Sequence, residues 1–445
     1  MNSKTGLVFF PAFDWAISPT HPEREERLLY TRDQIIEEGI LDFPDILEYK
    51  AKLAAKSDIQ RVHFCLPSYE NIISEAHLIA AGSAMALGDA WHNKEIKNGF
   101  ALVRPPGHHA MHITYGNRGF CNINNEAILI EYLRKKYGYR KIAVIDTDVH
   151  HGDGTQDIFY HDPDVLFISL HQDGRTLFPG TGFTDELGGP NAYGMTINLP
   201  LLPGSGDQSI LLIMKELILP ILRDFSPEII INSAGQDNHF TDPLANMNVT
   251  AQGYAQLTDL LQPDILVLEG GYAVETALPY VNLAIILALA EKDFTHVIEP
   301  RKYLRRGEES SQVLEYTKAL IENTGNIWTK RYDVDREKIF DQGPYSIRHK
   351  QIFYDTDFFT EEQQETVKKC DSCGGYLKNI TYLKAGRNKV KSLCISVPLY
   401  SCLHCQNEGE ALFYSQLNNP DFTRVFLQHK PRNLYLGKDD LNGKN

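Results

Sequence analysis

Short apolar runs rich in β-branched residues alternate with helix-compatible segments between Gly6 and about Leu289. Such alternation favours an α/β fold, in which a parallel sheet carries helices on both faces. The predicted strands are GLVFF, KIAVID, VLFISL, EIIINSAG and DILVLEGG, and the predicted helices are Ser74–Trp91, Asn124–Tyr137, Ser209–Phe225 and Thr250–Leu261. Several of these strands end in Asp, Gly or Ser. Because ligands of open α/β sheets bind at the carboxyl ends of the strands, these residues are candidates for a site.

The segment KIAVIDTDVHHGDGTQ concentrates ionisable residues directly after an apolar strand. Residues two apart in an extended chain point to the same side, so Asp146, Asp148 and His150 would share one face. Burying such groups is costly unless they are paired or bind an ion. A solvated acidic loop is the simpler alternative, but a divalent metal ion would also resolve the conflict. The remaining acids, Asp146 and Asp153, are suited to orienting histidines.

Three other stretches carry polar groups that complement this cluster. RPPGHHA places His108 and His109 on a loop with two prolines, INSAGQDNHF places Asp237 beyond a strand, and VLEGGYA places Tyr272 after another strand. Together they supply Zn²⁺ with two carboxylates and one imidazole, and they add a histidine pair and a phenol. A histidine can take a proton from activated water and pass it to a leaving amine, and a phenol can stabilise an oxyanion. The parts predict metal-assisted amide hydrolysis.

Composition narrows the classes of partner. The formal net charge of −14 argues against direct binding of nucleic acid, because binding phosphates requires a basic surface. The start of the chain, MNSKTGLVFFPAFDWAI, lacks the pattern of a signal peptide and is predicted to form the first strand. The longest apolar helix candidate, Val281–Ala290, is too short to cross a bilayer. We therefore expect no membrane partner and a cytoplasmic location.

Five of the seven cysteines lie in the last part of the chain. They include two CxxC pairs whose separation is long enough for a β-hairpin, and paired thiols at this spacing are typical of a closed structural zinc site. A redox-active thiol pair is the alternative. The predicted second Zn²⁺ has the ligands Cys370, Cys373, Cys402 and Cys405. We expect three parts: a catalytic domain, 1–298; an extension or linker that wraps it or leads onward, 299–366; and a zinc-ribbon-like module with a tail, 367–445, which is a candidate surface for a protein partner.

Taken together, the motifs resemble the zinc-dependent histone deacetylase and acetylpolyamine amidohydrolase superfamily, with the class II branch the most similar. The resemblance covers about Gly6 to Leu289. Its motifs, in order, are HPEREER, RPPGHHA, GFCNINNEA, DTDVHHGDGTQ, SLHQDGRTLFPGTG, SAGQDNHFTDPL and LEGGY. The resemblance implies the arginase/deacetylase-like α/β fold and an amidohydrolase of the EC 3.5.1 type.

The resemblance also implies two ions in this domain. The catalytic Zn²⁺ would be held by Asp148, His150 and Asp237. The family binds a structural potassium ion beside the zinc, in part through backbone carbonyls. The positions that match this K⁺ site are Asp146, Asp148, His150, Ser169 and Leu170.

Further roles follow from the resemblance for the residues that would act on the substrate. His109 would be the principal general base and acid, and His108 the second, largely electrostatic histidine. Asp146 would orient His108, and Asp153 would orient His109. Tyr272 would polarise the amide carbonyl and stabilise the tetrahedral intermediate.

Four residues match positions that line the family's substrate channel. Phe120 and Phe178 correspond to the aromatic pair around the acyl-lysine chain, and Gly119 allows close approach. Polyamine-selective members carry an acid at the position matched by Leu244, which pairs with the distant ammonium group of the substrate. Leucine cannot make this pair, so the resemblance favours acyl-lysine over acetylpolyamines.

The leading hypothesis is therefore a zinc-dependent deacylase that hydrolyses the amide of acetyl-lysine, or another acyl-lysine, in proteins or peptides. An acetylpolyamine hydrolase, or another small-molecule amide hydrolase, is the alternative within enzymes. A catalytically inactive protein that binds acyl-lysine or acts as a scaffold is the alternative from another class. The presence of every expected ligand, both histidines and the tyrosine argues against inactivity.

Overall fold

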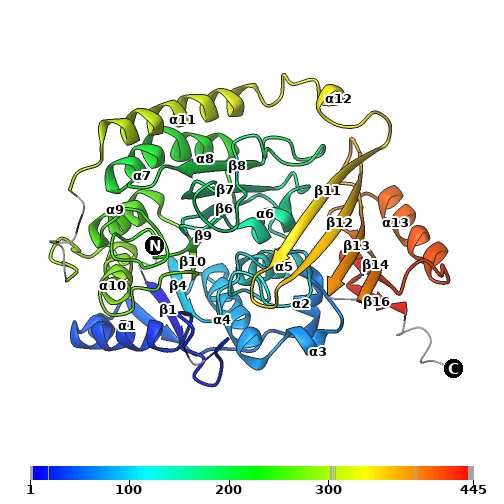
Figure 1. Cartoon of the computed structure of the whole chain (residues 1–445). Helices are drawn as coiled ribbons and strands as arrows, with labels where there is room; N and C mark the ends of the chain where they lie inside the picture. Colours follow the sequence, from blue (N-terminus) through cyan, green and yellow to red (C-terminus); the bar gives the residue numbers. More distant parts are fainter. Residues whose placement is uncertain are drawn as a thin grey trace.

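The computed structural model describes residues 4–18, 20–300, 303, 305, 307–385 and 388–438, so the end of the expected tail lies outside the described residues. Two sheets organise these residues: an eight-stranded sheet within an α/β domain, and a six-stranded sheet formed by the C-terminal part (Figure 1). In the described part of the chain, no helix is both long and apolar enough to span a bilayer.

The eight-stranded sheet is parallel throughout, as the alternation of strands and helices predicted. Its strand order is β2-β1-β4-β10-β9-β6-β7-β8. The strands are β1 (Thr5–Phe10), β2 (Ile46–Tyr49), β4 (Asn98–Val103), β6 (Ile142–Asp146), β7 (Val165–Gln172), β8 (Thr196–Leu201), β9 (Ile229–Ala234) and β10 (Ile265–Leu268). A separate two-stranded sheet pairs β3 (Phe64–Cys65) with β5 (Ile113–Thr114).

Both faces of this sheet are buried, which explains why its strands are continuous apolar runs. Successive residues of one strand point to opposite faces and therefore enter different cores. In β1, Leu7 belongs to one core and Val8 to the other, and in β6 the same holds for Ile145 and Val144. Helices cover the two faces, as predicted.

The predicted helices are all present, with ends set by local capping. The side chain of Asn124 accepts a hydrogen bond from the amide of Ala127 at the start of α5, and α5 ends at Gly138, which is left-handed. The helices of this domain are α1 (Glu26–Glu37), α2 (Lys56–Val62), α3 (Tyr69–Ile72), α4 (Glu75–His92), α5 (Asn125–Tyr137), α6 (Asp153–Phe159), α7 (Asp207–Ile213), α8 (Leu219–Phe225), α9 (Ala251–Leu261) and α10 (Leu278–Leu289), with shorter turns at Ile40–Asp42 and Met214–Ile218.

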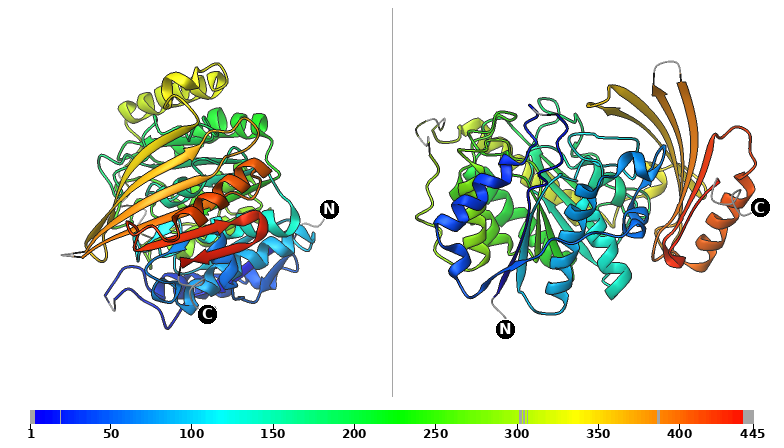
Figure 2. Two further views of the ribbon diagram at one scale, coloured as in Figure 1. Left: turned by 90° about the vertical axis from the view of Figure 1, so that its right-hand side faces the viewer. Right: turned by 90° about the horizontal axis from the view of Figure 1, so that it is seen from below.

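The second sheet has the strand order β11-β12-β13-β14-β15-β16 and is antiparallel except between β14 and β15. Its elements are β11 (Tyr345–Tyr354), β12 (Phe359–Lys368), β13 (Leu377–Ala385), β14 (Asn388–Val397), α13 (Leu403–Gln416), β15 (Arg424–His429), the turn Lys430–Arg432 and β16 (Leu434–Gly437). Figure 2 shows α13 on the face turned away from the α/β domain. The opposite face packs on that domain, where Ile352 and Tyr354 share a core with Met111 and Ile113.

The expected extension, 299–366, is not one unit in the structure: its first part forms two helices, and its last part belongs to the second sheet. Helix α11 (Ser311–Lys330) lies across the α/β domain, with Leu320 and Trp328 in its core, and α12 (Arg336–Ile339) follows. However, β11 and β12 belong to the second sheet, so the expected boundary between 366 and 367 falls inside β12. The sequence of β12, FTEEQQETVK, has mostly polar residues on both faces, since the side chains of its buried face contact polar partners. The alternation of apolar and polar residues by which a strand is recognised is therefore missing.

Candidate active site

The predicted site residues follow four neighbouring strands of the parallel sheet, β4, β10, β9 and β6. Because all four strands run the same way, their carboxyl ends open at one edge of the sheet. The residues that the structure brings to this edge are His108 and His109 after β4, Asp146 at the end of β6 with Asp148 and His150 after it, Asp237 after β9 and Tyr272 after β10.

Asp148, His150 and Asp237 point one ligand atom each toward a common centre, and these atoms lie within 4.8 Å of one another. His150 Nδ1 is 3.1 Å from Asp148 Oδ1 and 3.1 Å from Asp237 Oδ2. Ligands of a tetrahedral zinc at about 2.0–2.1 Å would be about 3.3 Å apart, so the set fits Zn²⁺. The other carboxylate oxygens accept hydrogen bonds from the amides of Gly270 and Val149, which fixes both side chains.

The electrostatics of this cluster suit a cation. Burial by itself would lower the pKa of His150, but its contacts with Asp148 and Asp237 raise it to about 10. In the metal-free protein the imidazolium thus offsets part of the negative charge of the two carboxylates. A metal ion needs the neutral imidazole, so binding would release a proton.

The two histidines of the pair lie side by side, with ring centroids 4.1 Å apart. His108 Nδ1 is 3.1 Å from Asp146 Oδ2, and His109 Nδ1 is 2.8 Å from Asp153 Oδ1, the partners that the motifs predicted. Burial, together with the nearby charges of His108 and His150, lowers the pKa of His109 well below its usual value. Burial would also lower the pKa of His108, but Asp148 and Asp146 raise it well above. In the metal-free protein these shifts favour the neutral form of His109 and the charged form of His108.

Tyr272 lies nearby with its ring buried, and burial raises the pKa of its phenol well above its usual value. The hydroxyl is therefore protonated and able to donate a hydrogen bond. The guanidinium of Arg27 lies 5.0 Å from the centre of the ring. The amide of Tyr272 donates to Asp242 Oδ2 at 2.8 Å, which fixes the backbone after β10.

The predicted channel residues flank these groups. Phe178 packs edge-on against His109 with centroids 5.1 Å apart, and Phe120 packs edge-on against Tyr272 at 5.5 Å. Gly119 has φ +52°, and a Cβ there would come within 2.4 Å of His109, so a side chain does not fit. Leu244 is 36% exposed and lies on the loop after β9.

The residues matched to the potassium site also come together. Asp146 and Ser169 are direct partners in the pairing of β6 with β7, and Leu170 follows Ser169. The hydroxyl of Ser169 is 2.8 Å from His171 Nδ1. Asp146 and Ser169 thus lie side by side on adjacent strands, and K⁺ itself stays a prediction.

Sequence reasoning missed several residues that hold the site in place. Arg118 forms an ion pair with Asp153 Oδ2 at 2.6 Å, on the oxygen that does not face His109. Glu269 accepts hydrogen bonds from the amides of Gly107 and His108. Arg118 directly precedes the motif GFCNINNEA and Glu269 lies inside the motif LEGGY, so in both cases a charged residue next to a motif glycine was the available signal.

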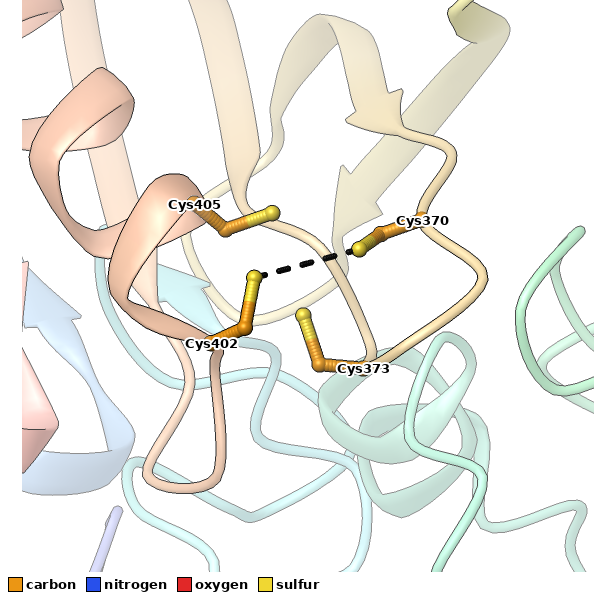
Figure 3. Close-up of side chains that lie close together, drawn as sticks. All are labelled: Cys370, Cys373, Cys402 and Cys405. Atoms are coloured by element: carbon orange, nitrogen blue, oxygen red, sulfur yellow. Dashed lines mark hydrogen bonds between the residues drawn. The ribbon is translucent and has the colours of Figure 1, made fainter.

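The C-terminal cysteines form a second cluster. The sulfur atoms of Cys370, Cys373, Cys402 and Cys405 lie within 4.8 Å of one another and turn toward one centre (Figure 3). Zinc–sulfur bonds of about 2.3 Å would separate the sulfurs by about 3.8 Å, and Cys370 and Cys402 are 4.0 Å apart. The amide of Cys405 holds the pKa of the Cys402 thiol at about 7. The hairpin of β13 and β14 fills the interval between the two pairs, as predicted, and the cluster can bind a structural zinc.

Comparison with known proteins identifies relatives of the α/β domain. Residues 66–288 match the histone deacetylase domain. A protein of Archaeoglobus fulgidus named probable deacetylase is 43% identical over 328 residues, which are 67% of this chain and 90% of that protein. The Arabidopsis thaliana protein named histone deacetylase 14, chloroplastic, is 42% identical over 213 residues, 45% of this chain and 49% of that one. The crystal structure of the HDA15 HD domain aligns with a TM-score of 0.64 and 29% identity, covering 74% of this chain and 96% of that one.

Proposed function

The chain belongs to the histone deacetylase family and is an amidohydrolase, and from this premise we propose that it removes acyl groups from lysine side chains of proteins or peptides. One observation supports the proposal above others. Asp148, His150 and Asp237 converge on one point beside a neutral His109 and a protonated Tyr272. A metal site, a base and a hydrogen-bond donor are what amide hydrolysis requires.

Zinc is typical of the family, and the donor set fits it. When bound by Asp148, His150 and Asp237, the ion would supply Lewis-acid activation of water and of the amide carbonyl. The protein groups would do the rest. The Nδ1 atom of His109 faces Asp153, so Nε2 is the atom that would accept the proton of the attacking water and later donate it to the lysine amine.

The other groups stabilise charge. His108, positively charged between Asp146 and Asp148, would attract the negative charge that develops near the metal site. Tyr272 would donate a hydrogen bond to the oxyanion that forms from the amide carbonyl. Phe120 and Phe178 would enclose the apolar part of the acyl-lysine chain and keep water away from it.

The choice between acyl-lysine and acetylpolyamine depends on Leu244. An apolar, partly exposed side chain at this position has no charge to pair with a distant ammonium group, which supports acyl-lysine in a peptide. A small-molecule amide hydrolase stays the alternative enzyme, and an inactive binding protein the alternative of another class.

Turnover of acetyl-lysine peptides, longer acyl-lysine peptides and acetylated polyamines, with metal content measured on the same sample, tests the proposal. We expect the highest kcat/KM for an acyl-lysine peptide. Preference for an acetylpolyamine would overturn it in favour of the small-molecule hydrolase, and binding of a hydroxamate without any turnover would support the inactive protein. Leu244→Glu should raise acetylpolyamine turnover, whereas the uncharged Leu244→Gln should not.

Three further proposals concern a second ion of the α/β domain, the location of the protein and a protein partner. We propose a structural K⁺ near Asp146 and Ser169, which activity in potassium against sodium buffers would test. We also propose a cytoplasmic location, although two relatives are named chloroplastic. The cysteine-containing sheet is proposed as a surface for a protein partner.

A further inference from the structure

Strand β11 forms one edge of the second sheet, and this edge faces the α/β domain (Figure 1). Alternate side chains of the strand, including Ile352 and Tyr354, are buried against that domain, while Gln351 and Phe353 are exposed. At the end of β11 the chain meets the predicted channel, because the amide of Gly119 donates to Asp355 Oδ1 at 2.8 Å. The edge therefore leads to the active site.

The hydrogen bonds at both ends of β11 show which backbone groups point outward. The guanidinium of Arg118 donates to the carbonyl of Phe353 at 3.1 Å, and the amide of Ile347 donates to Asp341 at 2.6 Å. The amide of Ile347, a single donor, is therefore turned away from β12, and the carbonyl of Phe353 is turned toward Arg118 on the same side. Because the two directions alternate along an antiparallel pair, the N–H and C=O groups of His349 and Gln351 also point outward.

A cavity of about 340 Å³ runs along this edge. On one side it is lined by Arg348 and by Lys350, Gln351, Ile352 and Phe353 of β11, and on the other by Phe178, Pro179 and Thr181. Phe178 is also a wall of the predicted channel, and the guanidinium of Arg118 lies 5.3 Å from its ring centre. The groove and the channel thus share a wall.

Charged side chains in the groove are largely engaged with one another. Lys350 and Arg348 both contact Asp157, and both also contact Glu365 on β12. Paired charges offer little to a ligand, so the outward backbone groups are the main polar feature of the β11 side. A partner that binds them must itself present a row of backbone groups, as an extended peptide does.

We propose that the outward edge of β11 binds the main chain of the acylated peptide as an added strand, with the acyl-lysine entering the channel between Phe120 and Phe178. This inference rests on the proposed deacylase function. Recognition of main-chain groups is independent of most side chains, so the enzyme would accept many sequences around the lysine. It would nevertheless prefer peptides long enough to reach His349 and Gln351.

Replacing one outward amide tests the proposal without removing a hydrogen bond of the fold. Proline is tolerated at an edge position whose N–H points outward, so Gln351→Pro should fold, and Gln351→Ala is the matched control that keeps the amide. The substrates are an acetyl-lysine decapeptide and a single capped acetyl-lysine. We expect Gln351→Pro to lower kcat/KM for the decapeptide by about 3- to 10-fold and to leave the single residue unchanged. An equal effect on both substrates, or on both variants, would overturn the proposal.

A second experiment uses the unaltered protein. Decapeptides methylated at one backbone nitrogen at a time should lose activity at alternate positions, because every second amide of an added strand faces its neighbour. Uniform losses, or none, would overturn the added strand. If neither the decapeptide nor the single residue is hydrolysed, the deacylase function itself fails, and this result is distinct from a failure of the β11 proposal.

Discussion

The two clusters that can hold a metal ion differ in donors, burial and position. The cluster of Asp148, His150 and Asp237 uses two carboxylates and one imidazole from different strand ends, and it is nearly fully buried. The four cysteines offer identical sulfur donors, two from the turn after β12 and two from the start of α13, and only Cys405 is buried. Three protein ligands leave a coordination position for chemistry, whereas four close the site. One cluster is thus suited to catalysis and the other to holding a fold together.

The second region is nevertheless tied to the first. The turn with Cys370 is held by Asn191 of the α/β domain, which accepts from the amide of Cys370 and donates to the carbonyls of Lys368 and Gly374. At the far end of the sheet, Asp355 accepts from the amide of Gly119. The cysteine cluster therefore anchors a sheet that reaches the predicted channel.

Removing a ligand of the catalytic cluster should have the largest effect on activity. Asp237→Ala leaves two ligands, so we expect bound zinc to fall from two ions to one per chain and deacylation to fall to the background rate. Metal analysis and peptide turnover measure this, with the exposed Asp185→Ala as a control. Retention of both zinc ions would contradict the ligand assignment.

Removing the groups around the metal should separate chemistry from metal binding. His109→Ala should lower kcat by about 10²–10⁴-fold, and Tyr272→Phe by about 10²–10³-fold, because the base or the oxyanion donor is lost. Both variants should still carry two zinc ions. The exposed His296→Ala serves as the matched control, and wild-type rates in either active-site variant would remove its assigned role.

Opening the cysteine cluster should affect stability more than catalysis. Cys402→Ser should release the second zinc and destabilise the C-terminal sheet by a few kcal/mol, less than the about 10–16 kcal/mol that zinc contributes to zinc-finger peptides, because this sheet also packs on the α/β domain. Activity should fall less than about tenfold, through the loss of the contacts of Arg118 and Gly119. Thermal unfolding and zinc content measure this, with Cys65→Ser as a control. Complete loss of turnover would show that the cysteine cluster is required for catalysis as well as for stability.

The smallest expected effect concerns the pH dependence of stability. Burial raises the pKa of Glu361 on β12 to about 7, although hydrogen bonds from Thr381 and Gln363 act in the opposite direction. In the unfolded chain the carboxyl group of Glu361 has its usual pKa of 4.5 and loses its proton above that pH. The folded chain keeps this proton until the pH approaches about 7. The free energy of unfolding therefore falls as the pH rises from about 4.5 to about 7.

Glu361→Gln should remove this fall in the free energy of unfolding, which amounts to at most about 3 kcal/mol. The variant should gain stability relative to the wild type between pH 5.5 and pH 8 in denaturant unfolding. Glu362→Gln, at a side chain that is 44% exposed, is the matched control and should show no such gain. Parallel pH profiles of the wild type and Glu361→Gln would contradict the assignment.

Much of the α/β domain and of its site was readable from local patterns. Strands buried on both faces are continuous apolar runs, so β6, β7, β9 and β10 stood out, and their parallel direction brings their polar ends to one edge. The spacing of Asp148 with His150, and of each CxxC pair, is short enough for the local backbone to set the geometry.

Contacts between distant segments were decided only by the tertiary structure. Strand β12 buries Glu361 and Glu365 against polar partners, which no period in its sequence reveals. The pairing of Arg118 with Asp153, and of Asp355 with Gly119, joins residues far apart in the chain. Periodicity and spacing follow from the geometry of the local backbone, whereas the partner of a buried charge depends on how whole elements pack, and that packing is a property of the entire fold.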